Sequence, residues 1–281
     1  NIAILNNIAL DHKSISELQT LFGHYLDSAK TGVVINHDCP NSMHIKPENK
    51  KVVTFSLKNP EADVYATNVH AHSDGISFSL NGAETIKLSV FGWFNVANAL
   101  AAIAAAFMAG VPMVAAAKSL ESFQGTKRRL ERVGAENGVL VLDDFAHNPH
   151  KIAASIKALK EYPGRLFVLY QPHGFASTKH QYADLVQAFS QNLANQDTLI
   201  MMDIYYVGGT ADKSVSSADL IRDIREQGGV HALHIPKREG IAAVLLPQLK
   251  EGDRICVMGA RDNTLSDFAQ QLLGALKLKS A

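Results

Sequence analysis

The hydrophobic pattern of the chain changes near residue 120. Beyond that point, short apolar runs alternate regularly with longer amphipathic segments. The apolar runs predict buried strands at Val139–Leu142, Leu166–Tyr170, Leu199–Met202, Val230–His234 and Ile255–Met258. The amphipathic segments predict helices at about Pro149–Lys160, Tyr182–Ala194, Ser217–Gln227, Ile241–Leu249 and Ser266–Leu276. Strands and helices in alternation indicate a mostly parallel sheet that is covered on both faces.

Before residue 120 the pattern is mixed. Strands are expected at Ile2–Leu5, Val33–Asn36 and Thr85–Phe91, and a helix at about Ser16–Ala29. Apolar and polar residues alternate in three further segments separated by turn residues, which predicts antiparallel strands at Lys51–Leu57, Val64–His72 and Gly75–Leu80. The alanine-rich stretch Ala97–Ala117 contains a glycine and a proline, and it fits a buried globular helix better than a membrane span. We therefore expect an α/β protein with one domain over residues 1–122 and a second over 123–281.

The composition narrows the class of protein. A length of 281 residues allows two domains with their own cores, and 47% apolar residues is typical of a globular chain. Basic and acidic residues balance at 27 each, so net charge gives no reason to expect nucleic acid or an anionic membrane as a partner. Cys39 and Cys256 are far apart and show no metal-ligand spacing. They read as free thiols of a reducing compartment, so a cytoplasmic protein is expected.

The segment from Asp143 to Pro149 carries the most informative chemistry. A predicted buried strand ends in Asp143 and Asp144, His147 follows, and Asn148 and Pro149 are suited to the N-cap and first position of a helix. Polar groups at the carboxyl end of a strand, facing a helix N-terminus, form ligand sites in α/β folds. The alternative interpretation is an ordinary strand-to-helix turn with acids on the surface.

Further polar residues follow the other strands of the second half. His173, Tyr205 and Arg261 come after the second, third and last predicted strands. All would lie at one edge of a parallel sheet, together with Asp144 and His147, where open α/β sheets bind ligands. We therefore treat His147, His173, Tyr205 and Arg261 as candidate substrate-binding residues.

The first half contains two candidate sites. Asp11 and His12 could hold a divalent cation, with His12 as the ligand and Asp11 orienting it, although their spacing alone favours a capping Asp beside a surface His. Asn95 and Asn98 lie one turn apart at the start of the alanine-rich helix. Asn95 could cap that helix, while the carboxamide of Asn98 could pair with an adenine edge. Two capping residues without a ligand would give the same pattern.

A basic cluster spans the boundary between the two halves. Lys127, Arg128, Arg129 and Arg132 lie within the segment 125–132. Guanidinium groups bind phosphate in a bidentate way, so Arg128 and Arg129 are candidate phosphate ligands. A solvated basic linker is the alternative.

Taken together, these motifs resemble those of the Mur ligase family of peptidoglycan synthesis. Residues 7–12 are similar to its Asn-Ile-x-x-Asp-His motif, and residues 92–98 to its Gly-x-His-Asn-x-x-Asn motif. Residues 143–149 resemble Asp-Asp-Tyr-Ala-His-His-Pro, a pattern of the branch that acts on UDP-N-acetylmuramate. The motifs follow the family order along essentially the whole chain. The resemblance implies part of an ATP-binding central domain followed by a Rossmann-like C-terminal domain.

The resemblance also implies an activity. In this family ATP phosphorylates the carboxylate of the UDP-sugar substrate, and an amine then attacks the acyl phosphate. Adding L-alanine to UDP-N-acetylmuramate is the main expectation, because Gln171-Pro172-His173 resembles that branch. Adding a tripeptide, as in murein recycling, is the alternative, because the Arg-Arg-Leu-Glu run and the Asp-Asp-Phe-Ala-His run look more like that branch.

Residue roles are carried over at the matching positions. His12 would bind Mg²⁺, and Asn98, with Asn95, would hold adenine. Arg129, with Arg128 beside it, would meet the nucleotide phosphates, and Asp144 would hydrogen-bond the ribose. His147 and His173 would line the cleft where amine and activated carboxylate meet, so Arg129 and His147 are the expected catalytic residues.

Three departures from the family limit these expectations. Phe94 stands where the family has His, and Gly174 and Ser177 stand where alanine-adding members have two arginines after Gln-Pro-His. No Gly-x-x-x-x-Gly-Lys-[Ser/Thr] phosphate loop is present. We therefore expect this to be the carboxy-terminal part of a longer ligase, with an incomplete central domain, and we expect the chain alone not to turn over ATP.

Two other classes of protein remain as alternatives. A metal-dependent hydrolase could use Asp143, Asp144, His147 and His150, with the pair His70 and His72. A non-catalytic nucleotide-binding module is the other alternative. The sequence does not indicate an oligomeric state.

Overall fold

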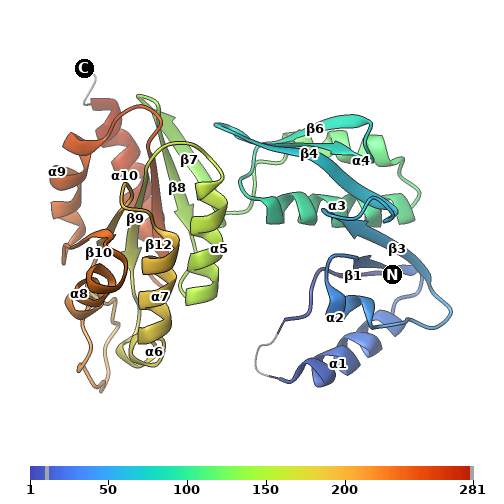
Figure 1. Ribbon diagram of the computed structural model, residues 1–281, viewed down its shortest axis with the longest axis horizontal. Helices are drawn as coiled ribbons and strands as arrows, with labels where there is room; N and C mark the ends of the chain where they lie inside the picture. Colours follow the sequence, from blue (N-terminus) through green and yellow to red (C-terminus); the bar gives the residue numbers. More distant parts are fainter. Residues whose placement is uncertain (10–12, 279–281) are drawn as a thin grey trace. The chain divides into compact units, whose positions relative to one another are not determined.

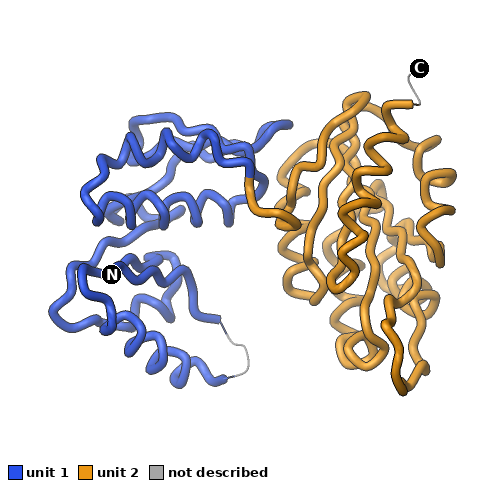
Figure 2. The backbone as a smooth tube through the Cα atoms, turned by 180° about the vertical axis from the view of Figure 1, so that it is seen from behind, with its two compact units in different colours: residues 1–124 blue, residues 125–281 orange. Residues whose placement is uncertain are grey.

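The computed structural model describes residues 1–9 and 13–278. Two compact units make up the chain, unit 1 from Asn1 to Gln124 and unit 2 from Gly125 to Ala281 (Figure 2). Each unit contains a sheet of six strands with its own buried core. No helix among the described residues is long and apolar enough to cross a membrane.

The sheet of unit 1 follows the chain order. Its strands are β1 (Ile2–Leu5), β2 (Gly32–Asn36), β3 (Lys51–Ser56), β4 (Val64–His72), β5 (Gly75–Leu80) and β6 (Glu84–Leu88). The antiparallel prediction is confirmed for β4, β5 and β6. It is wrong for the segment Lys51–Leu57, because β3 pairs in parallel with both β2 and β4. Alternation of apolar and polar residues shows which face of a strand is buried, and it carries no information on strand direction.

The helices of unit 1 cover its sheet from two sides. They are α1 (Ile15–Asp27), α2 (Pro40–Met43), α3 (Trp93–Met108), α4 (Met113–Ser119) and the 3₁₀ turn η1 (Leu120–Ser122). α3 packs against the inner strands, whereas Leu26 of α1 belongs to a separate apolar cluster with β1 and β2. The stretch Ala97–Ala117, which we expected to form one helix, forms two. Gly110 adopts φ 94° and Pro112 cannot continue the helix, so the chain turns between α3 and α4.

The sheet of unit 2 is mostly parallel, as the sequence predicts. Its order is β11-β10-β9-β12-β8-β7. The strands are β7 (Glu131–Glu136), β8 (Val139–Asp144), β9 (Leu166–Gln171), β10 (Thr198–Met201), β11 (His231–His234) and β12 (Arg254–Gly259). β7 pairs antiparallel with β8 at one edge. The sequence pattern missed β7, because an edge strand keeps charged residues such as Glu131 and Arg132 and lacks a continuous apolar run.

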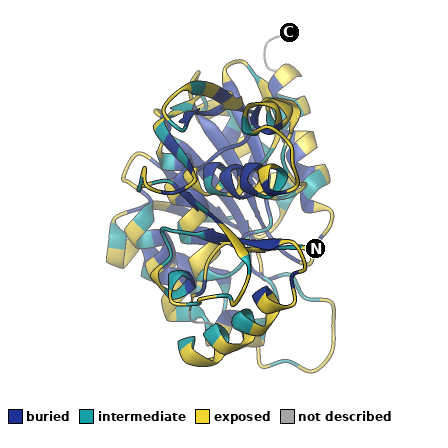
Figure 3. Cartoon of the chain, turned by 90° about the vertical axis from the view of Figure 1, so that its right-hand side faces the viewer, coloured by how far each residue is buried: buried dark blue, intermediate teal, exposed yellow. Residues whose placement is uncertain are grey.

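Helices cover both faces of this second sheet (Figure 1). α5 (Pro149–Lys160), α7 (Tyr182–Asn192) and α8 (Ser217–Gly228) pack together on one face. α9 (Ile241–Leu245) and α10 (Leu265–Leu278) share a core with the other face. Shorter helical segments complete the unit: α6 (Phe175–His180), η2 (Arg238–Gly240) and η3 (Leu246–Gln248). The strands between these layers are largely buried (Figure 3), so their exposed chemistry is confined to the strand ends.

Candidate functional site

The loops that follow four parallel strands of unit 2 bring polar side chains together. The rings of His147, after β8, and His173, after β9, lie with their centroids 5.4 Å apart at 64°. Tyr205, after β10, forms an isolated parallel bridge with His173 and accepts a 2.9 Å hydrogen bond from the Gly174 N–H. Arg261, after β12, is close enough to lower the pKa of His173. The predicted grouping of these four residues at one sheet edge is therefore confirmed.

Local geometry fixes the orientation of His147. Its Nδ1 lies 2.9 Å from the carbonyl oxygen of Phe145, and a carbonyl can only accept, so Nδ1 carries the proton. In the neutral ring, Nε2 then carries the lone pair and could accept a substrate proton. Helix α5 begins at Pro149 as predicted, and the Asn148 side chain caps it by accepting from the Lys151 N–H at 2.9 Å. The cap holds the loop that carries His147.

His173 is held as a neutral imidazole. Burial lowers its pKa, and the nearby His147 and Arg261 lower it further because they disfavour a second positive charge. A neutral ring can accept a proton or a hydrogen bond at one nitrogen. The His147–His173 pair is thus chemically suited to receive a proton from an incoming amine.

The two carboxylates at the end of β8 are both interior groups. Asp143 is fully buried, and it accepts from the Ser266 hydroxyl at 2.5 Å and from Arg128 Nε at 3.5 Å. Asp144 accepts from the Ser155 hydroxyl, and burial raises its pKa. The alternative interpretation of surface acids is therefore wrong. The predicted ribose contact of Asp144 stays a prediction.

Arg128 and Arg129 have different environments. The Arg128 guanidinium pairs with Asp143, donates from Nη2 to the Gly259 carbonyl at 2.7 Å and lies 5.0 Å from the Phe145 ring centroid. Arg128 is thus part of the framework that joins β8 to β12, and a solvated basic linker is the wrong description of it. Arg129 is exposed, which leaves its charge accessible to an anion. Of the two predicted phosphate ligands, Arg129 is the better placed.

The described residues give no support to a metallohydrolase. No three or more His, Cys, Asp or Glu side chains in residues 1–9 and 13–278 are arranged to hold a metal ion. His150 is exposed on α5, whereas Asp143 and Asp144 of β8 are buried, and His70 and His72 are exposed on β4 of unit 1. The predicted Mg²⁺ ligand His12 and its neighbour Asp11 lie outside the described residues.

In unit 1, three asparagine side chains form a chain of hydrogen bonds. Asn6 Nδ2 donates to Asn98 Oδ1 at 3.1 Å, Asn98 Nδ2 donates to Asn95 Oδ1 at 3.4 Å, and Asn95 Nδ2 donates to the Phe91 carbonyl at 2.8 Å. The expectation that Asn95 caps α3 is wrong, because Gly92 is the N-cap and Asn95 lies within the first turn. Asn98 is exposed and keeps one N–H and one lone pair for a ligand, which matches a donor–acceptor base edge.

Asn6 is a residue that the sequence interpretation missed. It lies in the loop that follows β1, far from Asn98 in sequence, and only the fold brings the two amides together. Its position directly before the Asn7–His12 motif was the available signal.

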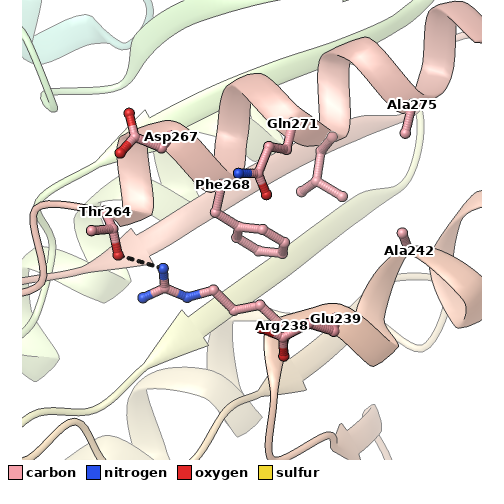
Figure 4. Close-up of a pocket in the computed structure, with 9 residues that line it drawn as sticks. Arg238, Glu239, Ala242, Thr264, Asp267, Phe268, Gln271 and Ala275 are labelled. Atoms are coloured by element: carbon pink, nitrogen blue, oxygen red, sulfur yellow. Dashed lines mark hydrogen bonds between the residues drawn. The ribbon is translucent and has the colours of Figure 1, made fainter.

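A separate hollow in unit 2 lies between η2 and α10 (Figure 4). It has a volume of about 560 Å³, and Arg238 and Phe268 form part of its lining. Arg238 donates from Nη1 to Thr264 Oγ1 at 2.6 Å and from Nη2 to Gln171 Oε1 at 3.0 Å, and it pairs with Asp262. Because these partners already satisfy its guanidinium, this hollow is a weaker candidate for anion binding than the strand-end loops.

Comparison with known proteins defines the class of the fold and site. A model of the Mur ligase middle domain matches residues 1–106, and a model of the Mur ligase glutamate ligase domain matches residues 128–261. The chain belongs to the Mur ligase family.

Particular relatives share one name. The chain is 34% identical to the UDP-N-acetylmuramate–L-alanine ligase of Desulfotalea psychrophila over 92% of this chain and 58% of that protein. It is 32% identical to the ligase of the same name from Desulfitobacterium hafniense, over 92% and 59%. The chain thus spans about three fifths of the length of these relatives.

Solved structures agree on the fold. UDP-N-acetylmuramate-alanine ligase from Thermotoga maritima matches with a TM-score of 0.73 at 22% identity, covering 99% of this chain and 60% of that one. A murein peptide ligase from Psychrobacter arcticus matches with a TM-score of 0.56 at 24% identity, covering 98% and 57%.

Proposed function

We propose that this chain forms the middle and C-terminal parts of an ATP-dependent ligase that joins L-alanine to the carboxylate of UDP-N-acetylmuramate. The observation that carries the proposal is the 34% identity to a ligase of that name across 92% of the chain. The strand-end loops of unit 2 support it, because they bring two imidazoles and the exposed Arg261 together where a polar substrate can bind.

Residues of each unit are proposed for the nucleotide-binding roles. The Asn98 carboxamide, held by Asn6 and Asn95, presents one donor and one acceptor to adenine. Exposed Arg129 would meet the phosphates and stabilise charge that develops as the terminal phosphoryl group moves to the substrate carboxylate. Mg²⁺ would neutralise phosphate charge, with His12 as its proposed protein ligand. Asp144 would hydrogen-bond the ribose, and Arg128 supports this region through Asp143.

The acceptor roles fall to the strand-end loops. His147 and His173 would orient the amine and take a proton as it attacks the acyl phosphate, since both are placed to offer a lone pair. Tyr205 and Arg261 flank His173 and would contact the substrates.

Calorimetry with ADP and Mg²⁺ tests the nucleotide site. Binding to the 281-residue chain should be lost or weakened about tenfold in Asn98→Ala, which removes a bidentate amide contact worth about 1–3 kcal/mol. Asn192→Ala, on α7 of unit 2, is the matched control and should bind as the unmodified chain does. Equal affinities for the unmodified chain and Asn98→Ala would contradict the assignment.

A tripeptide-adding ligase is the second candidate. One observation favours it: Gly174 and Ser177 follow His173 where alanine-adding members carry two arginines. The only lysine of α6, Lys179, is already paired with Asp212 at 2.6 Å and does not replace them. Comparing L-alanine with the tripeptide as the amine, in a phosphate-release assay, separates the two candidates.

A further inference from the structure

Two buried polar atoms without partners share a narrow pocket beside His173. The pocket is too narrow to admit a water molecule. Its lining residues are His147, Tyr170, His173, Ser177, Thr178, Gln181 and Leu185. Among the described residues that line it, only His173 Nδ1 and Gln181 Oε1 are buried side-chain polar atoms with no hydrogen-bond partner. Such groups are rare in folded proteins because their desolvation is uncompensated.

Two other polar groups of the pocket have hydrogen-bond partners. The Tyr170 hydroxyl donates to the His147 carbonyl at 3.3 Å, and Ser177 Oγ accepts from Gln181 Nε2 at 3.0 Å. Since no water fits, the side chains that line the pocket are the nearest possible partners of each unpartnered atom. An imidazole nitrogen can carry a proton and an amide oxygen can only accept, so the two atoms are chemically complementary.

The backbone holds both residues in place. The Gly174 N–H donates to the Tyr205 carbonyl and the Tyr205 N–H donates to the Pro172 carbonyl, which fixes the loop on either side of His173. Gln181 lies at the junction of α6 and α7, and its bond to Ser177 assigns its NH₂ group to the helix side and its oxygen to the buried side.

We infer that Gln181 is a positioning residue for His173. A rotation of the Gln181 side chain would bring Oε1 to the Nδ1–H of His173, and this contact would keep the proton on Nδ1 and the lone pair on Nε2. No hydrogen bond joins the two side chains in the present structure. His147 has the same arrangement, with Nδ1–H on the Phe145 carbonyl, so both rings would offer Nε2 to the incoming amine. The role of Nε2 as acceptor of a proton from the amine rests on the proposed function. The assignment of the His173 tautomer does not.

The groups around His173 favour a neutral ring. A neutral imidazole has two tautomers, so a hydrogen bond is needed to select one of them. His147, from the loop after β8, and Arg261, from the loop after β12, both lower the pKa of His173, as does burial. Gln181 and Ser177 bring no charge from α6 and α7, and Tyr205, in the loop after β10, forms a backbone bridge with His173.

Nitrogen NMR of the chain labelled with ¹⁵N-histidine tests the inference directly. His173→Gln identifies the His173 signals by their loss. The unmodified chain should show a protonated Nδ1 and an unprotonated Nε2 for His173, and Gln181→Met should shift the ring toward a mixture of tautomers. Gln187→Met, an exposed position on α7, is the matched control and should leave the tautomer unchanged. A proton on Nε2 in the unmodified chain, or an unaltered tautomer in Gln181→Met, overturns the inference.

A second variant keeps the test decisive if Gln181→Met does not fold. Gln181→Glu would place a carboxylate on Nδ1–H, so the titration midpoint of His173 should rise by about one pH unit, a tenfold change in the protonated fraction. An unchanged midpoint overturns the inference. These readouts need neither ATP nor substrate, so failure of the proposed ligase activity would leave them intact, and their failure would leave the ligase proposal standing.

Discussion

The neighbouring residues Arg128 and Arg129 differ in burial and in what their side chains contact. Arg128 has a side chain that is 14% exposed and serves the buried Asp143, whereas Arg129 is exposed. Sequence alone shows two equal cations, because whether a guanidinium faces inward depends on the left-handed backbone that Arg128 and Leu130 adopt, at φ 57° and 47°. The sequence narrowed the candidate phosphate ligand to Arg128 or Arg129, and the fold was needed to choose between these two residues.

We predict opposite effects for these two arginines. Arg128→Ala leaves the Asp143 carboxylate buried without its cation, and should lower the free energy of unfolding of unit 2 by about 3 kcal/mol. Arg129→Ala should change it by less than about 0.5 kcal/mol, as exposed positions do, while weakening nucleotide binding. Urea unfolding and calorimetry measure the two properties. Equal loss of stability in both variants would contradict this division of roles.

Asp144 should give stability a distinct pH dependence. Burial raises its pKa, so the folded chain binds this proton more tightly than the unfolded chain does. Its contribution to stability is full below the ordinary carboxyl pKa and is lost as pH rises through the raised value. The stability of the unmodified chain relative to Asp144→Asn should therefore fall as the pH rises above about 4, as measured by urea unfolding. A difference that grows with pH would contradict this.

At the scale of elements, apolar runs and helix signals predicted the parts that hold the site. The turn from β8 into α5 was readable because a buried run meets Asn148 and Pro149, a cap and a first helical residue. The sequence pattern could not predict the direction of β3, the edge strand β7 or the short helix α6. Their identity depends on pairing and packing partners that are distant in sequence.

Two glycines lie at the end of the unit 2 sheet opposite the candidate site, and they should differ in how well they tolerate substitution by alanine. Gly164, before β9, has φ 104°, and a Cβ there would overlap the carbonyl oxygen of Gly252. Gly252, before β12, has φ 87° and open space around its Cα. Gly252→Ala should therefore cost about 1–2 kcal/mol of stability from its backbone conformation alone. Gly164→Ala must also move backbone and should cost clearly more in thermal or urea unfolding. Equal costs would show that the loops adjust freely.

At the scale of the whole molecule, two cores imply two folding units. The described residues of unit 2 include their own sheet, helices and apolar cluster. We predict that residues 125–281 fold alone and unfold cooperatively in urea. Arg128→Ala should lower the free energy of unfolding of this fragment as much as it does in the 281-residue chain. Circular dichroism and urea titration of that fragment check this. A fragment that binds hydrophobic dyes and unfolds without a transition would contradict independent folding.

The proposed reaction is tested most directly by a coupled assay of ADP release from the longer ligase that is proposed to contain this chain. We predict release only when ATP, Mg²⁺, UDP-N-acetylmuramate and L-alanine are all present, and a loss of at least about tenfold in His147→Gln, which removes a proton acceptor. ADP release that does not depend on UDP-N-acetylmuramate, or that needs the tripeptide in place of L-alanine, would contradict the claim.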